Sequence, residues 1–233
     1  GRLLLVGNSR WHWAERQPGG LRVWHEGCPP PNPGAADPWG AIEAWACVGH
    51  WPEALPRPPA RRIGLEQVPL RDLPPWLGID RALAAWRAWQ VEGRGVLVAD
   101  AGTALSLTRV DGDGSFRGGR ISAGLGLQLR SLAEATAQLP CVDPAAVADA
   151  DPMAVDPWPR ATAAAMELGC LKACAAAVVQ GWSDLQGQEE PGRLWLTGGD
   201  AGRLLPLLQA AGLEPLFAPD LVLEGLAAAA ALS

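Results

Sequence analysis

The chain has 233 residues, of which 48% are apolar and 19% are charged, and its net charge is −6. This size and balance are typical of a globular protein with one large domain or two small ones. The acidic charge argues against nucleic acid as a partner, because binding a phosphate backbone needs clustered Lys and Arg. We find no apolar run of membrane-spanning length and no signal sequence, so we expect a cytoplasmic protein without membrane partners.

Two residue counts exclude further classes of site. The five cysteines form no C-x-x-C pair, which favours a reduced protein without structural zinc. The single lysine, Lys172, lies in a stretch that we expect to be helical. A Walker-type loop and a protein-kinase strand each need a lysine in a defined context, so neither explains nucleotide binding here. Because the chain begins at Gly1 and not at a methionine, we expect its native N-terminus to lie upstream.

The first half of the chain is predicted to hold strands, a loop-rich region and a helix. Apolar runs, alternation and Pro/Gly clusters place the boundaries. The expected elements are a buried strand from residue 3 that turns at Gly7-Asn8 into an alternating strand, a third strand at 21–26, a loop at 27–38, a short helix at 39–45, a strand at 45–49 and an amphipathic helix at 80–90.

At Val96 the pattern restarts. The expected elements are strands at 96–100, 104–110 and 115–122, helices at 126–139 and 160–182, a strand at 193–199, and helices at 201–211 and 221–232. Both halves open with an apolar strand, a small polar turn and a second strand that leads to a third. This repeat predicts two α/β lobes, 1–93 and 94–233, with a cleft between them and a hinge at Gly93-Arg94-Gly95. A single doubly wound sheet is the alternative.

Three turns at strand ends are candidates for binding phosphate. They are Gly7-Asn8-Ser9, Asp100-Ala101-Gly102-Thr103 and Thr197-Gly198-Gly199. Glycine lets the backbone approach a ligand closely, and the neighbouring hydroxyl and amide groups supply hydrogen-bond donors. Each turn alone has an ordinary structural interpretation. Three of them, each at the end of an apolar strand, favour phosphate binding.

A fourth candidate is Leu77-Gly78-Ile79-Asp80-Arg81, at the expected start of a helix. Asp80 has the residue type of an N-cap, and spacing alone favours that structural interpretation. In a functional interpretation, the Asp80 carboxylate lies near the cleft and Arg81 binds an anionic substrate through its forked guanidinium.

Several motifs, taken in order, resemble type III pantothenate kinases. The most specific are the GxDR at 78–81, the DxGTA at 100–104 and the GGxIxxG at 118–124, and LLLVGNSR, ATAQLP, TAAAMELG and LTGGD support them. The resemblance covers nearly the whole chain and is weakest over 27–75. That family belongs to the actin, Hsp70 and sugar-kinase superfold. The resemblance therefore implies an α/β protein of two ribonuclease-H-like lobes with ATP in the cleft.

The resemblance also implies an activity, which is ATP-dependent phosphorylation of pantothenate, the first step towards coenzyme A. Asp80 is then the general base that takes the proton from the substrate's primary hydroxyl. The residues implied to bind pantothenate are Gly78, Ile79, Asp80, Arg81 and Thr162. Those implied to bind ATP are Val6, Gly7, Asn8, Ser9, Arg10, Thr103, Gly198 and Gly199. Asp100 is implied to bind a monovalent cation, potassium or ammonium, and Mg²⁺ is expected with ATP. The family forms homodimers.

One position departs from the family pattern. The family's first turn reads D-x-G-N-T, whereas this chain has Leu5 in place of the aspartate and Ser9 in place of the threonine. The missing carboxylate leaves open how a divalent cation is held. Two alternatives to the kinase therefore stay open at this point. One is a weak or inactive relative that acts as a binding or regulatory protein, and the other is a phosphatase of the same superfold.

Overall fold

We analysed a computed structural model of the chain. It describes residues 1–27, 41–49, 51, 53, 57–58, 60–143, 153, 156–186 and 192–232. The chain forms two compact units, each built around a five-stranded mixed sheet. The first unit comprises Gly1–Val91, Gly114–Phe116 and Asp220–Ser233, and the second comprises Glu92–Asp113 and Arg117–Pro219.

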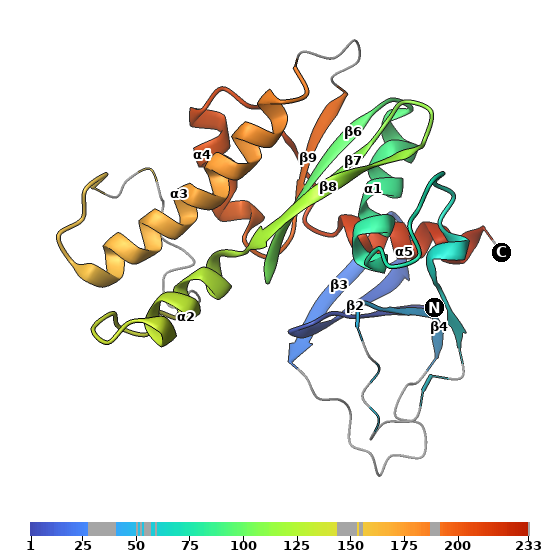
Figure 1. Ribbon diagram of the computed structural model, residues 1–233. Helices are drawn as coiled ribbons and strands as arrows, with labels where there is room; N and C mark the ends of the chain where they lie inside the picture. Colours follow the sequence, from blue (N-terminus) through green and yellow to red (C-terminus); the bar gives the residue numbers. More distant parts are fainter. Residues whose placement is uncertain are drawn as a thin grey trace. The chain divides into compact units, whose positions relative to one another are not determined.

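The sheet of the first unit has the strand order β3-β2-β1-β4-β5 (Figure 1). Central strand β1 runs antiparallel to β2 and parallel to β4, β2 is antiparallel to β3, and β4 is parallel to β5. All four apolar residues of β1 are buried, as expected for a strand covered on both faces. The strands are β1 (Arg2–Val6), β2 (Arg10–Gln17), β3 (Gly20–Gly27), β4 (Ile42–Cys47) and β5 (Arg61–Arg62).

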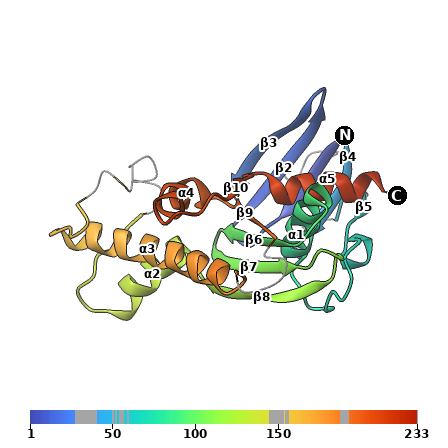
Figure 2. The same ribbon diagram turned by 90° about the horizontal axis from the view of Figure 1, so that it is seen from above.

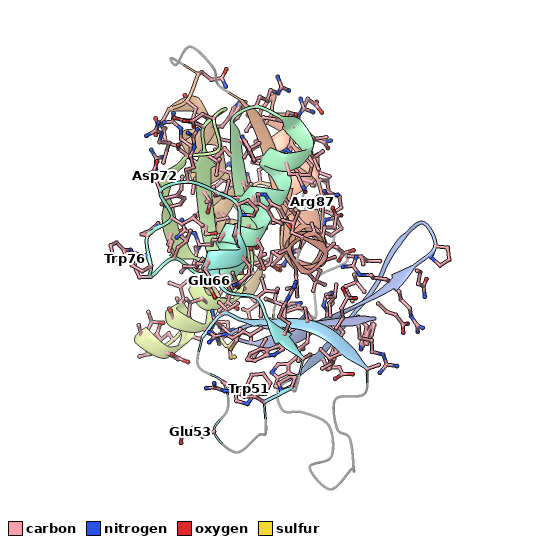
Figure 3. All side chains as sticks on the ribbon, turned by 90° about the vertical axis from the view of Figure 1, so that its right-hand side faces the viewer. Trp51, Glu53, Glu66, Asp72, Trp76 and Arg87 are labelled. Carbon is pink, nitrogen blue, oxygen red and sulfur yellow. The ribbon has the colours of Figure 1, made fainter. Side chains whose placement is uncertain are left out.

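Tryptophans cover one face of this sheet. Trp11, Trp13 and Trp45 form a buried cluster with Leu4 and Val6. Trp51 packs against it, with its ring centroid 4.9 Å from that of Trp45 (Figure 3). Most tryptophans of the first half that the structure describes therefore fill a core. An exception is Trp76, which is 84% exposed in the loop before α1.

Two helices complete the first unit. Helix α5 (Leu221–Ala231) packs on β1, β2 and β4. Helix α1 (Ile79–Glu92) meets α5 closely, because a Cβ at Gly225 would collide with the backbone of Leu83. The Arg87 guanidinium lies 3.4 Å from Glu224 and links the same two helices. A 3-10 turn, η1 (Leu65–Gln67), precedes α1.

The sheet of the second unit repeats the first. Its order is β10-β9-β6-β7-β8, with β6 antiparallel to β7 and parallel to β9. Strands β6, β7, β8, β9 and β10 occupy the places that β1, β2, β3, β4 and β5 have in the first sheet. This correspondence confirms the predicted α/β fold with an internal repeat. The strands are β6 (Val96–Ala101), β7 (Ala104–Val110), β8 (Phe116–Ala123), β9 (Arg193–Thr197) and β10 (Leu216–Phe217).

Three helices pack on one another and on this second sheet. They are α2 (Leu125–Ala135), α3 (Thr162–Ser183) and α4 (Ala201–Ala210). Helices α2 and α3 lie side by side in both views (Figures 1 and 2). Largely buried Arg203 on α4 donates a hydrogen bond to Glu167 on α3. The core joins Leu105 of β7 and Leu196 of β9 to side chains from all three helices.

Helix α3 corrects the expectation that no segment is apolar enough to span a membrane. Among the described residues, Thr162–Ser183 passes that test by length and composition. One such helix is weak support for a membrane span, because the core helix of a soluble protein passes the same test. Eight of its 22 residues are buried within the second unit.

Four sequence predictions differ from the structure. The helix predicted at 39–45 is wrong for residues 42–45, which lie in β4, because pairing with buried β1 overrides the helix preference of alanine. Helix α2 ends at Ala135, not at residue 139. Helix α5 joins the first unit, whereas the boundary at 93 and 94 assigned it to the second lobe. Finally, residues 114–116 also belong to the first unit. The loop predicted at 27–38 falls almost wholly outside the described residues.

Candidate active site

The GxDR motif forms the entry to α1. Gly78 accepts the first helical hydrogen bond, from the N–H of Ala82 at 3.1 Å. Leu77 and Ile79 on either side are buried and anchor the segment. A Cβ at Gly78 would lie 2.6 Å from Oδ1 of Asp80, so only glycine leaves room for this carboxylate position. The motif thus places a carboxylate, Asp80, and a guanidinium, Arg81, next to each other in the first turn of α1.

The Asp80 carboxylate is desolvated yet held in place. Its Oδ1 accepts a hydrogen bond from the backbone N–H of Arg81 at 2.9 Å. Burial raises the pKa of Asp80, and the hydrogen bond and charge of Arg81 oppose that rise. The N-cap interpretation is corrected, because Asp80 lies inside α1 and the cap position falls on Gly78. The pKa of Arg81 is lowered, mainly by burial.

The first candidate phosphate turn, Gly7-Asn8-Ser9, joins β1 to β2. The Gly7 N–H donates to the Arg10 carbonyl at 3.0 Å, which closes the turn. Asn8, Ser9 and Arg10 are exposed, whereas Val6 is buried at the end of β1. The turn therefore presents polar groups to solvent at the end of a buried strand. That arrangement fits an anion-binding turn.

The second and third turns meet in the second unit. Strands β6 and β9 are parallel neighbours, and Asp100 lies opposite Thr197 in the register. Gly198 has φ +98°, and a Cβ there would lie 2.5 Å from both Asp100 Oδ1 and the Ala101 carbonyl. Thr103 and Gly199 are exposed beside them. The structure thus brings Asp100, Thr103 and Gly198 to one edge of the sheet, as expected for the carboxyl ends of parallel strands.

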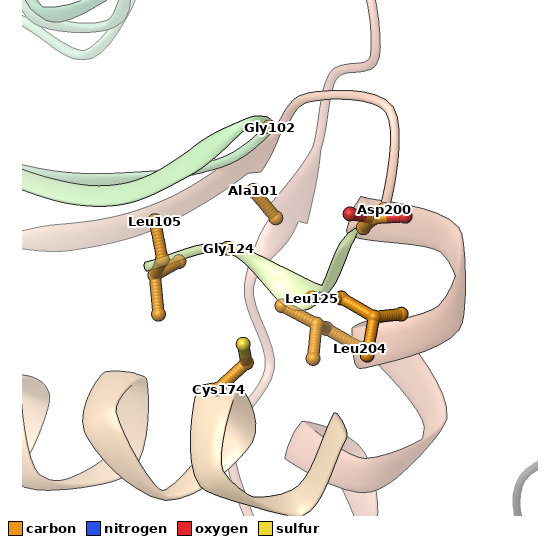
Figure 4. A pocket seen from close by; sticks show the side chains of 8 residues that line it. All are labelled: Ala101, Gly102, Leu105, Gly124, Leu125, Cys174, Asp200 and Leu204. Carbon is orange, nitrogen blue, oxygen red and sulfur yellow. The ribbon is translucent and has the colours of Figure 1, made fainter. Parts of the chain in front are cut away.

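Further residues contribute to this edge. Asp200 donates its N–H to the Ala101 carbonyl at 2.9 Å, and Gly124 donates its own to Thr103 at 3.0 Å. Burial, then the charge of Asp200, raises the pKa of the Cys174 thiol to about 11, so the thiol stays protonated. A small hollow is lined by Ala101, Gly102, Leu105, Gly124, Leu125, Cys174, Asp200 and Leu204 (Figure 4). Asp200, which directly follows the glycine pair, is not among the site residues predicted from the sequence, and Cys174 is a buried protonated thiol, as its place in an apolar helical stretch predicts.

The remaining candidate, Thr162, is exposed and begins α3. It belongs to the second unit, whereas the GxDR motif belongs to the first.

The two expected cations fit their positions differently. At Gly198 a carboxylate oxygen of Asp100 and the Ala101 carbonyl oxygen converge, which is the donor set that a hard cation prefers. The first turn offers no such set at the position where the family has an aspartate. Leu5 is 5% exposed and apolar there. Residue 5 of this chain therefore does not fit a ligand for a divalent ion.

Comparisons with known proteins agree with these motifs. A model of the type III pantothenate kinase family matches residues 61–184. A type III pantothenate kinase of Synechococcus sp. strain JA-3-3Ab is 44% identical over 188 residues, 79% of this chain and 75% of that protein. The type III pantothenate kinase of Synechococcus elongatus strain ATCC 33912 is 34% identical over 242 residues, 96% of this chain and 94% of that protein.

A solved structure carries the fold comparison. A Baf family protein from Campylobacter jejuni superposes with a TM-score of 0.61 at 17% identity, covering 98% of this chain and 96% of that one. At this identity the likeness establishes the fold alone. The sequence relatives, which match over most of their own length, establish more: the chain belongs to the type III pantothenate kinase family.

Proposed function

We propose that this protein transfers the γ-phosphoryl group of ATP to the primary hydroxyl of pantothenate, which yields 4'-phosphopantothenate and ADP in the first step of coenzyme A biosynthesis. One observation carries the proposal. A chain of this family keeps the GxDR motif and holds its aspartate, Asp80, as a desolvated carboxylate at the start of α1. A binding protein without catalytic activity has no need of a base in that state.

Asp80 is proposed as the general base. The hydroxyl oxygen attacks the γ-phosphorus, the bond from that phosphorus to the β–γ bridging oxygen breaks, and the hydroxyl proton moves to the Asp80 carboxylate. The raised pKa of Asp80 brings its basicity closer to what proton transfer needs near neutral pH. Its hydrogen bond with the Arg81 N–H fixes the orientation of the carboxylate.

The substrate and the nucleotide are proposed to bind at the remaining motif residues. Arg81 pairs with the pantothenate carboxylate, and Gly78, Ile79 and Thr162 complete its site. The residues proposed to contact ATP are Val6, Gly7, Asn8, Ser9, Arg10, Thr103, Gly198 and Gly199. Phosphoryl transfer depends mainly on positioning and charge neutralisation, which backbone N–H groups and cations supply. Asp100 is proposed to hold a monovalent cation, potassium or ammonium, which would neutralise phosphate charge when bound.

The assembly and location are also proposals. We propose a cytoplasmic homodimer that binds neither nucleic acid nor membrane. Three large apolar side chains of the second unit, on β8, on α2 and before α3, are solvent-exposed in the single chain and support a dimer: Ile121, Leu127 and Trp158. The net charge of −6 disfavours nucleic acid and anionic lipid. Light scattering of the purified chain tests the dimer, and a monomer at micromolar concentration contradicts it.

The decisive experiment measures ADP release with and without pantothenate, in potassium and in sodium buffer, and compares Asp80→Asn with the wild type. We expect pantothenate-dependent turnover in the wild type. Asp80→Asn should lower it by about 100- to 10,000-fold, the usual contribution of a general base. Glu66→Gln, which neutralises an exposed carboxylate of the same unit, is the control and should match the wild type. If ADP release does not depend on pantothenate in potassium buffer and does not depend on it in sodium buffer, the kinase function is contradicted.

Asp80→Asn, which should lower activity, is expected to raise stability at alkaline pH. Because the folded state raises the pKa of Asp80, its contribution is most favourable at acid pH and is lost as the pH rises through the folded pKa. Asparagine does not ionise, so Asp80→Asn should melt above the wild type at pH 8, and the two should converge at pH 3. Thermal melts at both pH values measure this difference. A variant that melts below the wild type at pH 8 contradicts the desolvation of Asp80.

A further inference from the structure

Two of the chain's three histidines meet beside the first phosphate turn. His12 on β2 lies opposite His25 on β3 in the strand register. Their Nδ1 atoms are 2.9 Å apart, and the rings meet edge to face with centroids 4.8 Å apart. A direct hydrogen bond between two imidazoles is therefore built into the β2–β3 hairpin.

That bond constrains the protonation of both rings. A neutral imidazole has one N–H and one lone pair, so one Nδ1 must donate and the other must accept. The ring that accepts then carries its proton on Nε2. Burial, followed by the nearby charges of His25 and Arg10, lowers the pKa of His12 to about 4. At neutral pH His12 is therefore neutral, and where His25 donates Nδ1–H to it, the proton of His12 lies on Nε2.

His12 directs its Nε2 atom towards the turn. A Cβ at Gly7 would lie 3.2 Å from this atom. Leu5 is the residue opposite His12 on β1, and Ala46 on β4 lies opposite Leu5. The row of side chains that crosses the sheet at this level is therefore Ala46, Leu5, His12 and His25, and the two imidazoles are its only polar members. An anion at the turn would meet imidazole and no carboxylate in this row.

We propose that His12 donates its Nε2–H to a phosphate oxygen of the nucleotide at the Gly7-Asn8-Ser9 turn, and that His25 is a positioning residue that donates Nδ1–H to His12. The inference rests on the nucleotide binding proposed above. The opposite tautomer would present a lone pair at His12 Nε2, which suits a divalent metal instead. Arg10 decides between the two ligands, because a positive charge this close attracts an anion and repels a metal ion.

The test titrates MgATP into the full chain and follows its total tryptophan fluorescence, to which Trp11 and Trp13 on either side of His12 contribute. His12→Leu should weaken MgATP binding about 10- to 100-fold, as the loss of a hydrogen bond to a charged group does. His12→Gln retains a side-chain N–H and should recover part of that loss. The KM for pantothenate should stay unchanged in both variants, which separates a phosphate contact from a general loss of structure.

The role of His25 is tested by its dependence on His12. His25→Asn retains an N–H close to the Nδ1 position and should bind MgATP nearly as the wild type does, whereas His25→Leu should bind it less tightly. In a His12→Leu background, His25→Leu should have no further effect. Nitrogen-15 NMR of the imidazoles should show His12 protonated at Nε2, and a proton found at its Nδ1 overturns the proposal. Arg22→Leu, at an exposed position on β3 opposite Glu15, is the control.

The outcomes distinguish this inference from the proposed function. A wild-type chain that binds no MgATP refutes the function itself. A wild-type chain that binds MgATP, together with His12→Leu and His12→Gln variants that bind it equally well, refutes only the role of His12. If Zn²⁺ or Mn²⁺ without nucleotide binds the wild type and not His12→Leu, the pair is a metal site and the phosphate assignment is overturned.

Discussion

The two sheets have corresponding strand orders, and the residue before the last of the central strand is apolar in one sheet and acidic in the other. Leu5 is the penultimate residue of β1, and Asp100 is the penultimate residue of β6. In each unit the glycine two residues further on donates its N–H to the first residue of the next strand, across two intervening residues in the first turn and one in the second. Gly7 donates its N–H to the first residue of β2 at 3.0 Å, and Gly102 donates its own to the first residue of β7 at 3.1 Å. The strand that leads into the turn therefore carries an apolar side chain at this position in the first unit and a carboxylate in the second.

The neighbours of these two residues differ in the same sense. Asp100 lies opposite Ser106 and Thr197, so oxygen atoms dominate its row. Leu5 lies opposite His12 and Ala46, so the polar atoms of its row are imidazole nitrogens. Residues directly opposite on adjacent strands share one face of the sheet. At this position the second unit therefore has oxygen-bearing neighbours, and the first unit has a methyl group and an imidazole.

The largest effect is expected when Asp100 of the second unit is replaced by leucine, the residue that the first unit has at the equivalent position. Asp100→Leu should lower turnover about 100-fold or more, because the carboxylate oxygen at the cation position is lost. The rate should also lose its dependence on potassium, which ADP release over a range of KCl concentrations measures. Asp100→Asn keeps an oxygen without the charge, and its turnover should lie between that of the wild type and that of Asp100→Leu. A variant with unchanged potassium dependence contradicts the role of Asp100.

The reverse exchange, Leu5→Asp, places a carboxylate where the surroundings are apolar. We expect the free energy of unfolding to fall by about 3 kcal/mol at pH 7, since a buried polar group without a designed partner is costly. Burial should raise the pKa of the new carboxyl group, so the loss should be smaller at pH 4 than at pH 7. Urea unfolding followed by tryptophan fluorescence measures both values. Leu5→Met, which conserves volume, should cost less than about 1.5 kcal/mol.

If Leu5→Asp proved as stable as the wild type at pH 7, the position would already tolerate a charge. The two turns would then differ in the side chains at positions 5 and 100, while the surroundings of both positions would accept a carboxylate.

The repeat of the fold could be predicted from the sequence, because its signal is local. The buried runs that became β1 and β6 are each followed by a small polar turn, and this pattern survives without knowledge of packing. The location of α5 could not be predicted in the same way. Arg16 donates to the Ala227 carbonyl at 2.6 Å, and Arg61 donates to the Ala230 carbonyl at 2.8 Å. These partners lie 211 and 169 residues apart, so no local pattern reveals which sheet the last helix covers.

The candidate site was predicted in part. Spacing around Asp80 indicated a helix cap, and only the resemblance indicated a base, because its raised pKa depends on burial that the sequence does not display. The His12–His25 pair was missed although a signal existed. A two-residue turn at Pro18-Gly19 pairs Gln17 with Gly20, and counting back along both strands places His12 opposite His25. The register of a tight hairpin thus predicts which side chains of its two strands lie opposite each other.

The smallest expected change in stability comes from substituting Gly7 and Gly102, the glycines of the two turns, because no polar side chain is altered. A Cβ at Gly7 would lie 2.9 Å from the Arg10 carbonyl, whereas at Gly102 the nearest atom would be Asp100 Oδ1 at 3.7 Å. We expect Gly7→Ala to lower the free energy of unfolding by about 1–2 kcal/mol, and Gly102→Ala to change it by less than about 0.5 kcal/mol. Urea unfolding of both variants measures the contrast.

The same two variants also report on ligand binding. A Cβ at Gly7 presses on the His12 ring, 3.2 Å away, so Gly7→Ala should weaken MgATP binding beyond what its stability loss explains. Gly102→Ala contacts no histidine within 4 Å, so a loss of MgATP binding in that variant reports on the second turn and not on His12. Equal losses of stability and of MgATP binding in the two variants would mean that close packing does not distinguish the turns. The contrast between the units would then reduce to the side chains at positions 5 and 100.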